Sequence, residues 1–132
     1  MKKLCLFAGS VLFSTWSMAQ NPLSVHVLNL ENGLPSPQVN VTLEEQKNGK
    51  WVQISQAKTN EQGRITALFP ENQKFKNTTY KVTFKTGEWF NKHNKKTFFP
   101  EVPVIFQTDG SVNHYHIPLL LSPYGYSTYR GN

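Results

Sequence analysis

The chain has 132 residues, which fits one domain and is too short for separate catalytic and cofactor domains. Hydrophobic residues make up 38% of it and charged residues only 17%, which excludes a disordered polar chain and a coiled coil. The net charge of +6 comes mostly from lysines, without a ladder of arginines and aromatic residues, so a nucleic-acid partner is not expected.

The first 19 residues have the pattern of a secretory signal peptide. Two lysines precede an apolar run over residues 4–13, and a small-x-small pattern ends at Ala19. The run is too short for a membrane-spanning helix, which needs about 20 apolar residues. We therefore expect cleavage after Ala19 and a mature domain of residues 20–132. This domain has no thiol, because the one cysteine is Cys5. We expect the protein to be exported to a bacterial periplasm and to have no contact with the membrane after cleavage.

Seven stretches of the mature chain alternate apolar and polar residues, as strands with one buried face do. They cover residues 23–29, 39–45, 51–56, 64–68, 80–85, 102–107 and 112–121. Turn-forming pairs such as Asn48-Gly49 and Asp109-Gly110 separate them at short spacing. This rhythm of short strands and turns indicates an antiparallel β-sandwich.

Two segments depart from this alternation. Residues 87–93 lack it and are expected to form one short surface helix. The tail, residues 122–132, contains three tyrosines and Arg130, whereas chain ends are usually loose and polar. Its Tyr-x-Tyr pattern predicts a final strand. Arg130 is then either available to hold an anionic or carbonyl-rich ligand or simply solvated on an edge strand.

The first and last long strands carry apolar residues on the face expected to point away from the core. These outward apolar residues are Leu28, Pro118 and Leu120. Soluble proteins usually bury such a patch against a partner, so we predict an oligomer. His26 and His116 share this face and are expected to line a cleft at the interface.

Three of the four histidines, His26, His114 and His116, are predicted on outward faces, where a histidine can act as acid, base or ligand. Each is also compatible with a plain surface or packing role. Together they offer three ligands for zinc, but no cysteine or nearby acidic residue supports a metal, so a metal-free site is preferred. His93, among lysines in the predicted helix, is expected to have no functional role.

Other catalytic patterns are missing from the sequence. It has no G-x-S-x-G elbow of a serine hydrolase and no glycine-rich phosphate loop. The chain has only two arginines, Arg64 and Arg130. A function that needs a planar bidentate donor must use one or both of them.

Four motifs resemble those of the 5-hydroxyisourate hydrolases, the transthyretin-related enzymes of urate breakdown. They are LSVHVLN at residues 23–29, NEQGRI at 60–65, FFPEV at 98–102 and HYHIPLLLSPYGYSTYRG at 114–131. The last run is the most specific, because transthyretin is similar in its Leu-Leu-Ser-Pro-Tyr stretch but lacks the histidine pattern and the Tyr-Arg-Gly ending. The resemblance spans nearly all of the mature chain and favours the enzyme over the hormone carrier.

The resemblance implies an all-β fold, a transthyretin-like two-sheet antiparallel β-sandwich with one short helix. It also implies a homotetramer with active sites in clefts between subunits. The family's catalytic residues correspond to His26, Arg64 and His116.

The family's C-terminal motif corresponds to Tyr129, Arg130, Gly131 and Asn132. Tyr129, Arg130 and Asn132 are therefore candidate substrate-binding residues, together with His26 and Arg64. The family usually ends in serine. Asparagine donates and accepts hydrogen bonds but cannot relay a proton as a hydroxyl does, so a proton-transfer role at this position is in question.

The implied reaction is hydrolysis of a cyclic amide, the ring of the small molecule 5-hydroxyisourate, to 2-oxo-4-hydroxy-4-carboxy-5-ureidoimidazoline, with no cofactor. His26 and His116 would jointly activate water, and Arg64, with Arg130 as second choice, would hold the substrate and stabilise the developing oxyanion. The alternatives are a non-enzymatic small-ligand carrier on the same sandwich or an exported structural module, since a fold does not fix a function.

Overall fold

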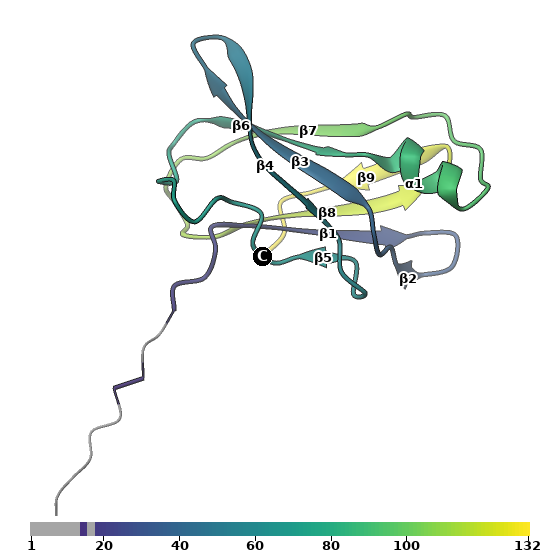
Figure 1. Ribbon diagram of the computed structural model, residues 1–132, viewed down its shortest axis with the longest axis horizontal. Helices are drawn as coiled ribbons and strands as arrows, with labels where there is room; N and C mark the ends of the chain where they lie inside the picture. The colour runs from purple at the N-terminus through teal and green to yellow at the C-terminus, as the bar shows by residue number, and fades with distance from the viewer. Residues whose placement is uncertain (1–13, 16–17) are drawn as a thin grey trace, which may run out of the picture.

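The strands assemble into two sheets that pack face to face, as the computed structural model shows for residues 14–15 and 18–132 (Figure 1). In chain order the elements are β1 (Leu23–Asn29), β2 (Leu34–Pro35), β3 (Asn40–Lys47), β4 (Lys50–Lys58), β5 (Arg64–Ile65), β6 (Thr79–Phe84), α1 (Thr86–Lys92), β7 (Val102–Gln107), β8 (Tyr115–Ser122) and β9 (Gly125–Thr128). One sheet has the order β2-β1-β8-β9, with β5 also paired to β1, and the other has the order β4-β3-β6-β7. The predicted all-β sandwich with one short helix is confirmed.

The predicted signal peptide, residues 1–19, lies for the most part outside the described residues. In the described part of the chain, no helix has both the length and the apolar character that crossing a membrane requires.

The core lies between the apolar faces of the two sheets. In β8 the side chains of Tyr115, Ile117, Leu119 and Leu121 are all buried, as the alternation of the sequence predicts. They face the buried side chains of β3 and β6 across the sandwich, including Leu43 and Phe84. Burial of these apolar surfaces is the main stabilising contribution to the fold.

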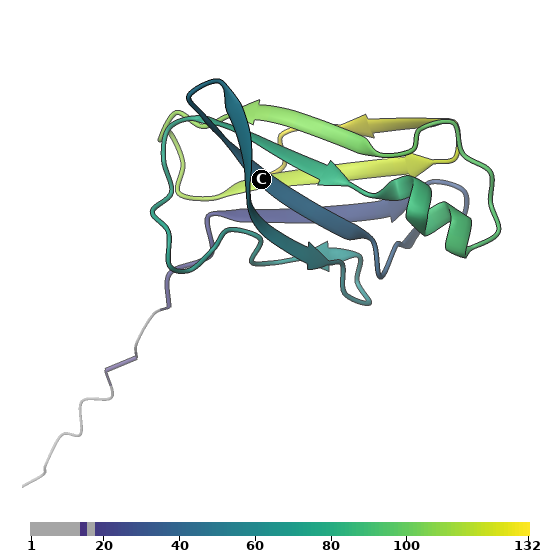
Figure 2. The same ribbon diagram turned by 45° about the horizontal axis from the view of Figure 1, so that its top comes forward.

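One pair of strands is not antiparallel, contrary to the prediction. β1 and β8 run side by side in the same direction, with Leu23 opposite Tyr115 and Asn29 opposite Leu121 (Figures 1 and 2). Parallel neighbours need a long crossover connection, and here the whole second sheet lies between them in the sequence. Local alternation reports which face a strand buries but not the direction of its neighbour.

Three local predictions also need correction. The strand expected at residues 64–68 ends after Ile65, and the one expected from residue 112 begins at Tyr115. Pro118 is buried rather than outward, because the C-terminal segment covers its ring: a Cβ at Gly131 would lie 3.1 Å from Cγ of Pro118. The hydroxyl of Thr128 also donates to the Pro118 carbonyl over 2.7 Å. The apolar patch predicted on this face is therefore limited to half-buried Leu28 and Leu120.

The helix α1 is amphipathic rather than a plain surface element. Trp89 and Phe90 are buried, and the indole N–H of Trp89 donates to the carbonyl of Pro37 over 2.8 Å. His93, which follows the helix, stacks against Trp89 with ring centres 4.2 Å apart. His93 therefore lies at the end of α1, away from the strands next to which the other histidines lie.

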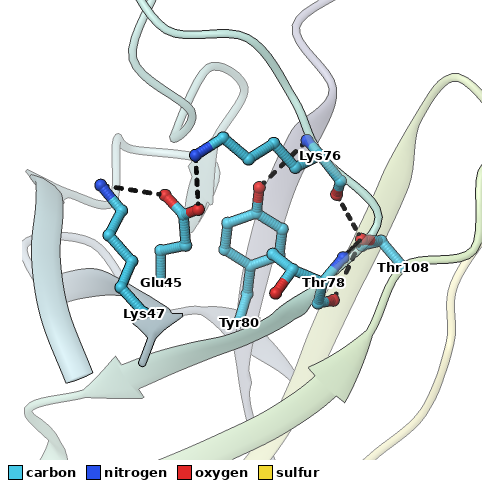
Figure 3. A network of polar contacts seen from close by, with 6 residues as sticks. All are labelled: Glu45, Lys47, Lys76, Thr78, Tyr80 and Thr108. Carbon is cyan, nitrogen blue, oxygen red and sulfur yellow. Dashed lines mark hydrogen bonds and ion pairs between the residues drawn. The ribbon is translucent and has the colours of Figure 1, made fainter. Parts of the chain in front are cut away.

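A polar network holds the segment before β6 against the second sheet (Figure 3). The carboxylate of Glu45 is almost fully buried and pairs with the ammonium groups of Lys76 at 2.9 Å and Lys47 at 3.5 Å. The backbone N–H of Lys76 donates to the hydroxyl of Tyr80 over 3.2 Å, and Thr108 donates to the Lys76 carbonyl over 2.6 Å. Burial raises the pKa of Tyr80, so its hydroxyl stays neutral in this network.

Replacing Tyr80 by phenylalanine tests the network. Tyr80→Phe keeps the buried ring but removes the acceptor of the Lys76 N–H, which should cost about 1 kcal/mol of unfolding free energy. Urea-induced unfolding would measure this loss. Tyr124→Phe is the matched control, because Tyr124 is 70% exposed and its variant should unfold as the parent does. Equal stability of the parent and both variants would contradict the contribution assigned to this hydroxyl.

Candidate active site

Strand register gathers His26, Arg64 and His116 on one face of the first sheet. His26 lies opposite Arg64 in the antiparallel pair of β1 and β5, and Ser24 lies opposite His116 in the parallel pair of β1 and β8. Directly paired residues point to the same side of a sheet, and so do residues two apart in one strand. The three predicted catalytic side chains therefore share one face within a single chain.

A tight turn presents Arg64 to this face. Gly63 has a φ of +69°, and a Cβ there would lie 2.5 Å from the carbonyl oxygen of Val27, so only glycine fits. The N–H of Val27 donates to the Gly63 carbonyl over 2.8 Å, which ties the turn to β1. The side-chain oxygen of Asn60 accepts from the backbone N–H of Arg64 over 2.9 Å. The guanidinium itself extends from an exposed residue.

A serine that the sequence analysis did not select joins the histidines. The hydroxyl of Ser24 lies 2.7 Å from Nδ1 of His116 and 2.9 Å from Nε2 of His114. Nδ1 of His114 in turn lies 2.6 Å from the carbonyl oxygen of Asn21. Ser24 is two residues from His26, but only the pairing of β1 with β8 reveals that it meets His116.

Ser24, His114 and His116 line a cavity of about 210 Å³, whereas His26, although on the same sheet face, is not among its lining residues. Its polar wall includes the side chains of Ser24, Arg64, His114 and His116, and Asn132 closes it from the C-terminus. In Figure 1 the end of the chain, marked C, lies near β5, in agreement with this placement. Asn132 thus reaches the same cavity as Arg64 and His116.

The other two residues of the C-terminal motif lie elsewhere. Tyr129 and Arg130 line a second cavity of about 240 Å³, next to Phe106 of β7. The guanidinium carbon of Arg130 lies 5.4 Å from the ring centre of Tyr115, a cation–π distance. Within one chain the structure therefore brings Asn132, but not Tyr129 or Arg130, to the histidines.

Both candidate bases have lowered pKa values. Burial lowers the pKa of His26 first and the positive charge of Arg64 second, while a hydrogen bond to the backbone of Gln62 acts the other way. Burial also lowers the pKa of His116, followed by the charges of Arg64, His26 and His114, with hydrogen bonding to Ser24 opposing them. The neutral imidazole, the form that accepts a proton, is therefore favoured at both positions.

Binding zinc through His114, as the zinc alternative requires, would break one of the hydrogen bonds of its ring. Both of its ring nitrogens are already within hydrogen-bond distance of protein oxygens, those of Asn21 and Ser24. The described residues contain no group of three or more histidine, cysteine, aspartate or glutamate side chains arranged to hold a metal ion.

Gly131 packs against the Cδ2 edge of the His116 ring. Its N–H donates to the His116 carbonyl over 2.9 Å, and a Cβ at this position would lie only 2.5 Å from Cδ2 of His116. The ring is thus held between the Ser24 hydroxyl and the Gly131 backbone.

We predict that Gly131→Ala displaces the His116 imidazole, because the new methyl group would overlap its Cδ2 atom. The NMR signal of the Cδ2–H group of His116 should move by more than the signals of the other histidines. Gly125→Ala is the control, since the nearest atom to a Cβ there is 3.8 Å away. An unmoved His116 signal in Gly131→Ala would refute the close packing.

The lowered pKa values predict that stability decreases with acidity. Because the ordinary value is 6.5 and both folded-state values lie below it, the unfolded chain takes up these protons first as the pH falls. The unfolding free energy should therefore drop between about pH 7.5 and about pH 5. Urea unfolding at these two pH values should show a smaller drop in unfolding free energy for the double variant His26→Gln/His116→Gln than for the parent. An equal drop would mean that these imidazoles are not the groups responsible.

Comparison with known proteins places the chain among relatives with a stated activity. A family model described as HIUase/Transthyretin family matches residues 23–131. The 5-hydroxyisourate hydrolase of Salmonella typhimurium is 49% identical over 112 residues, which cover 85% of this chain and 82% of that protein. The 5-hydroxyisourate hydrolase of Mus musculus is 35% identical over 114 residues, with coverage of 85% and 96%.

Solved structures agree with this placement. The 5-hydroxyisourate hydrolase of Klebsiella pneumoniae superposes with a TM-score of 0.70 at 32% identity, covering 85% of this chain and 94% of that chain. Sea bream transthyretin in complex with thyroxine superposes with a TM-score of 0.78 at 30% identity, covering 83% and 94%. This fold thus occurs both in a protein named as a hydrolase and in a transthyretin that binds thyroxine. On the family match over residues 23–131 and these identities, the chain belongs to the HIUase/transthyretin family.

Proposed function

We propose that the protein hydrolyses 5-hydroxyisourate to 2-oxo-4-hydroxy-4-carboxy-5-ureidoimidazoline in urate degradation. The observation that carries the proposal is the gathering of His26, His116 and Arg64 on one sheet face, with both imidazoles favoured in their neutral form. The relatives named 5-hydroxyisourate hydrolase support it, at up to 49% identity. A non-enzymatic carrier would not need these two histidines and this arginine.

The proposed reaction begins with attack of water on a ring carbonyl carbon. As the new C–O bond forms, one proton of the water passes to a neutral imidazole, and negative charge develops on the carbonyl oxygen. The carbonyl then re-forms, the ring C–N bond breaks, and the imidazolium returns the proton to the leaving nitrogen. A positioned base of this kind contributes about 10²- to 10⁴-fold to the rate.

Arg64 is the group proposed to hold the substrate and to stabilise the developing oxyanion. It lines the cavity that His116 lines, and its guanidinium offers a fixed fork of donors. Asn132 is proposed to hydrogen-bond the substrate through its side-chain amide. Tyr129 and Arg130 line the other cavity, so they would contact this substrate only from a neighbouring subunit.

We also propose a homotetramer that is exported to the periplasm. Leu28 and Leu120, which lie opposite one another in β1 and β8, stay half-buried on the face that carries the histidines. Covering them with another subunit would enclose the cavity and exclude bulk water from it. The expected cleavage after Ala19 supports the location.

The decisive experiment follows the absorbance of freshly generated 5-hydroxyisourate. The parent protein should accelerate its decay, and His116→Ala or His26→Ala should lower turnover at least tenfold, because each removes an imidazole that is proposed to take part in catalysis. His93→Ala is the matched control, since His93 packs against Trp89 on α1, and it should keep the parent rate.

Two results would contradict the proposal. If 5-hydroxyisourate decays at its spontaneous rate in the presence of the parent, the carrier alternative is favoured. The similarity to a thyroxine-bound transthyretin is the observation that supports this alternative. Full turnover in His26→Ala or His116→Ala would remove that histidine from the mechanism. Circular dichroism of each variant distinguishes a lost base from a lost fold.

A further inference from the structure

A chain of hydrogen bonds runs from the backbone to the candidate base. It starts at the carbonyl oxygen of Asn21, passes through both ring nitrogens of His114 and through the hydroxyl of Ser24, and ends at Nδ1 of His116. The three distances are 2.6, 2.9 and 2.7 Å, all within hydrogen-bond range. These residues come from two separate parts of the chain that the parallel pairing of β1 and β8 brings together.

The chemistry of the groups fixes the direction of this chain. A backbone carbonyl only accepts hydrogen bonds, so the proton of neutral His114 must be on Nδ1. Nε2 of His114 then only accepts, and the Ser24 hydroxyl must donate to it. The Ser24 oxygen has used its one proton, so it can only accept from His116, whose proton must therefore be on Nδ1.

This assignment leaves the lone pair of His116 on Nε2. Nδ1 faces Ser24, and the Cδ2 edge lies against Gly131. Within the described residues, Nε2 of His116 makes no hydrogen bond to the protein. An isolated neutral histidine prefers the opposite arrangement, with its proton on Nε2, which would leave no lone pair there to accept a proton.

We propose that Ser24 is a positioning residue that holds His116 in the Nδ1–H tautomer, which makes Nε2 of His116 the atom that takes the proton from water. This inference rests on the proposed hydrolase function for its catalytic consequence. It also chooses between the two candidate bases: His116 is the base, and no proton transfer is assigned to His26, which lies opposite Arg64. His114 acts only through Ser24.

The requirement at position 24 is a small group that both donates and accepts. Alanine provides neither function, whereas threonine has the same hydroxyl and suits a strand. Arg64, His26 and His114 are the charged or titratable groups that influence the pKa of His116, and none of them replaces the Ser24 oxygen at Nδ1. Ser24→Thr is therefore the conservative variant, and Ser24→Ala is the disruptive one.

Long-range proton–nitrogen NMR correlation of the histidine rings tests the tautomer directly. At about pH 8, where histidines are mostly neutral, the parent and Ser24→Thr should show the His116 proton on Nδ1. Ser24→Ala should shift His116 towards the Nε2–H form. Ser122→Ala is the matched control, because it removes a half-buried hydroxyl from β8 that donates to the Gly125 carbonyl instead, and its His116 should match the parent. A parent with the Nε2–H form, or an unchanged tautomer in Ser24→Ala, would overturn the proposal.

Kinetics provide the second measurement. Ser24→Ala should lower kcat about tenfold and leave KM nearly unchanged, because the substrate contacts stay in place while the competent tautomer becomes scarce. Ser24→Thr should stay within about threefold of the parent. A parent that does not hydrolyse 5-hydroxyisourate would end the proposed function, while the NMR result would still decide the tautomer. An active parent with unchanged kcat in Ser24→Ala would overturn the role of Ser24.

Discussion

The site depends on the parallel pairing of β1 with β8. This pairing joins segments that are about 90 residues apart in the sequence and sets Ser24 opposite His116. A shift of one residue would turn every side chain of one strand to the opposite face, separating His116 from Ser24 and exposing the core residues of β8. Because the buried residues of β1 and β8 resist such a shift, the hydrophobic core also fixes the geometry of the candidate site.

The electrostatic character of the site follows from unequal exposure. Arg64 is exposed, whereas His26 and His116 are half-buried beside it. A nearby cation and a drier environment both favour the neutral imidazole. A substrate with partial negative charge on its carbonyl oxygens would therefore meet a cation, Arg64, and an uncharged proton acceptor, His116. This combination suits hydrolysis without a cofactor.

Local patterns in the sequence predicted much of the fold. The core face of β8 and the strands β6 and β7 follow from alternation, the short helix follows from a break in it, and the catalytic candidates follow from the resemblance. The parallel pair, the buried Pro118 and the contacts of Ser24 depend on which strands become neighbours, which alternation does not contain. The tail shows the same limit. Arg130 and Asn132 are two residues apart, yet they line different cavities, because the contacts of the last residues with His116 and Tyr115 decide where each side chain lies.

The place of Asn132 also matters for handling the protein. Because this residue lies at the wall of the cavity, one step after a glycine pressed against His116, any peptide joined behind it leaves directly from the candidate site. An affinity tag or fluorescent fusion attached there would compete with a small molecule for the same space.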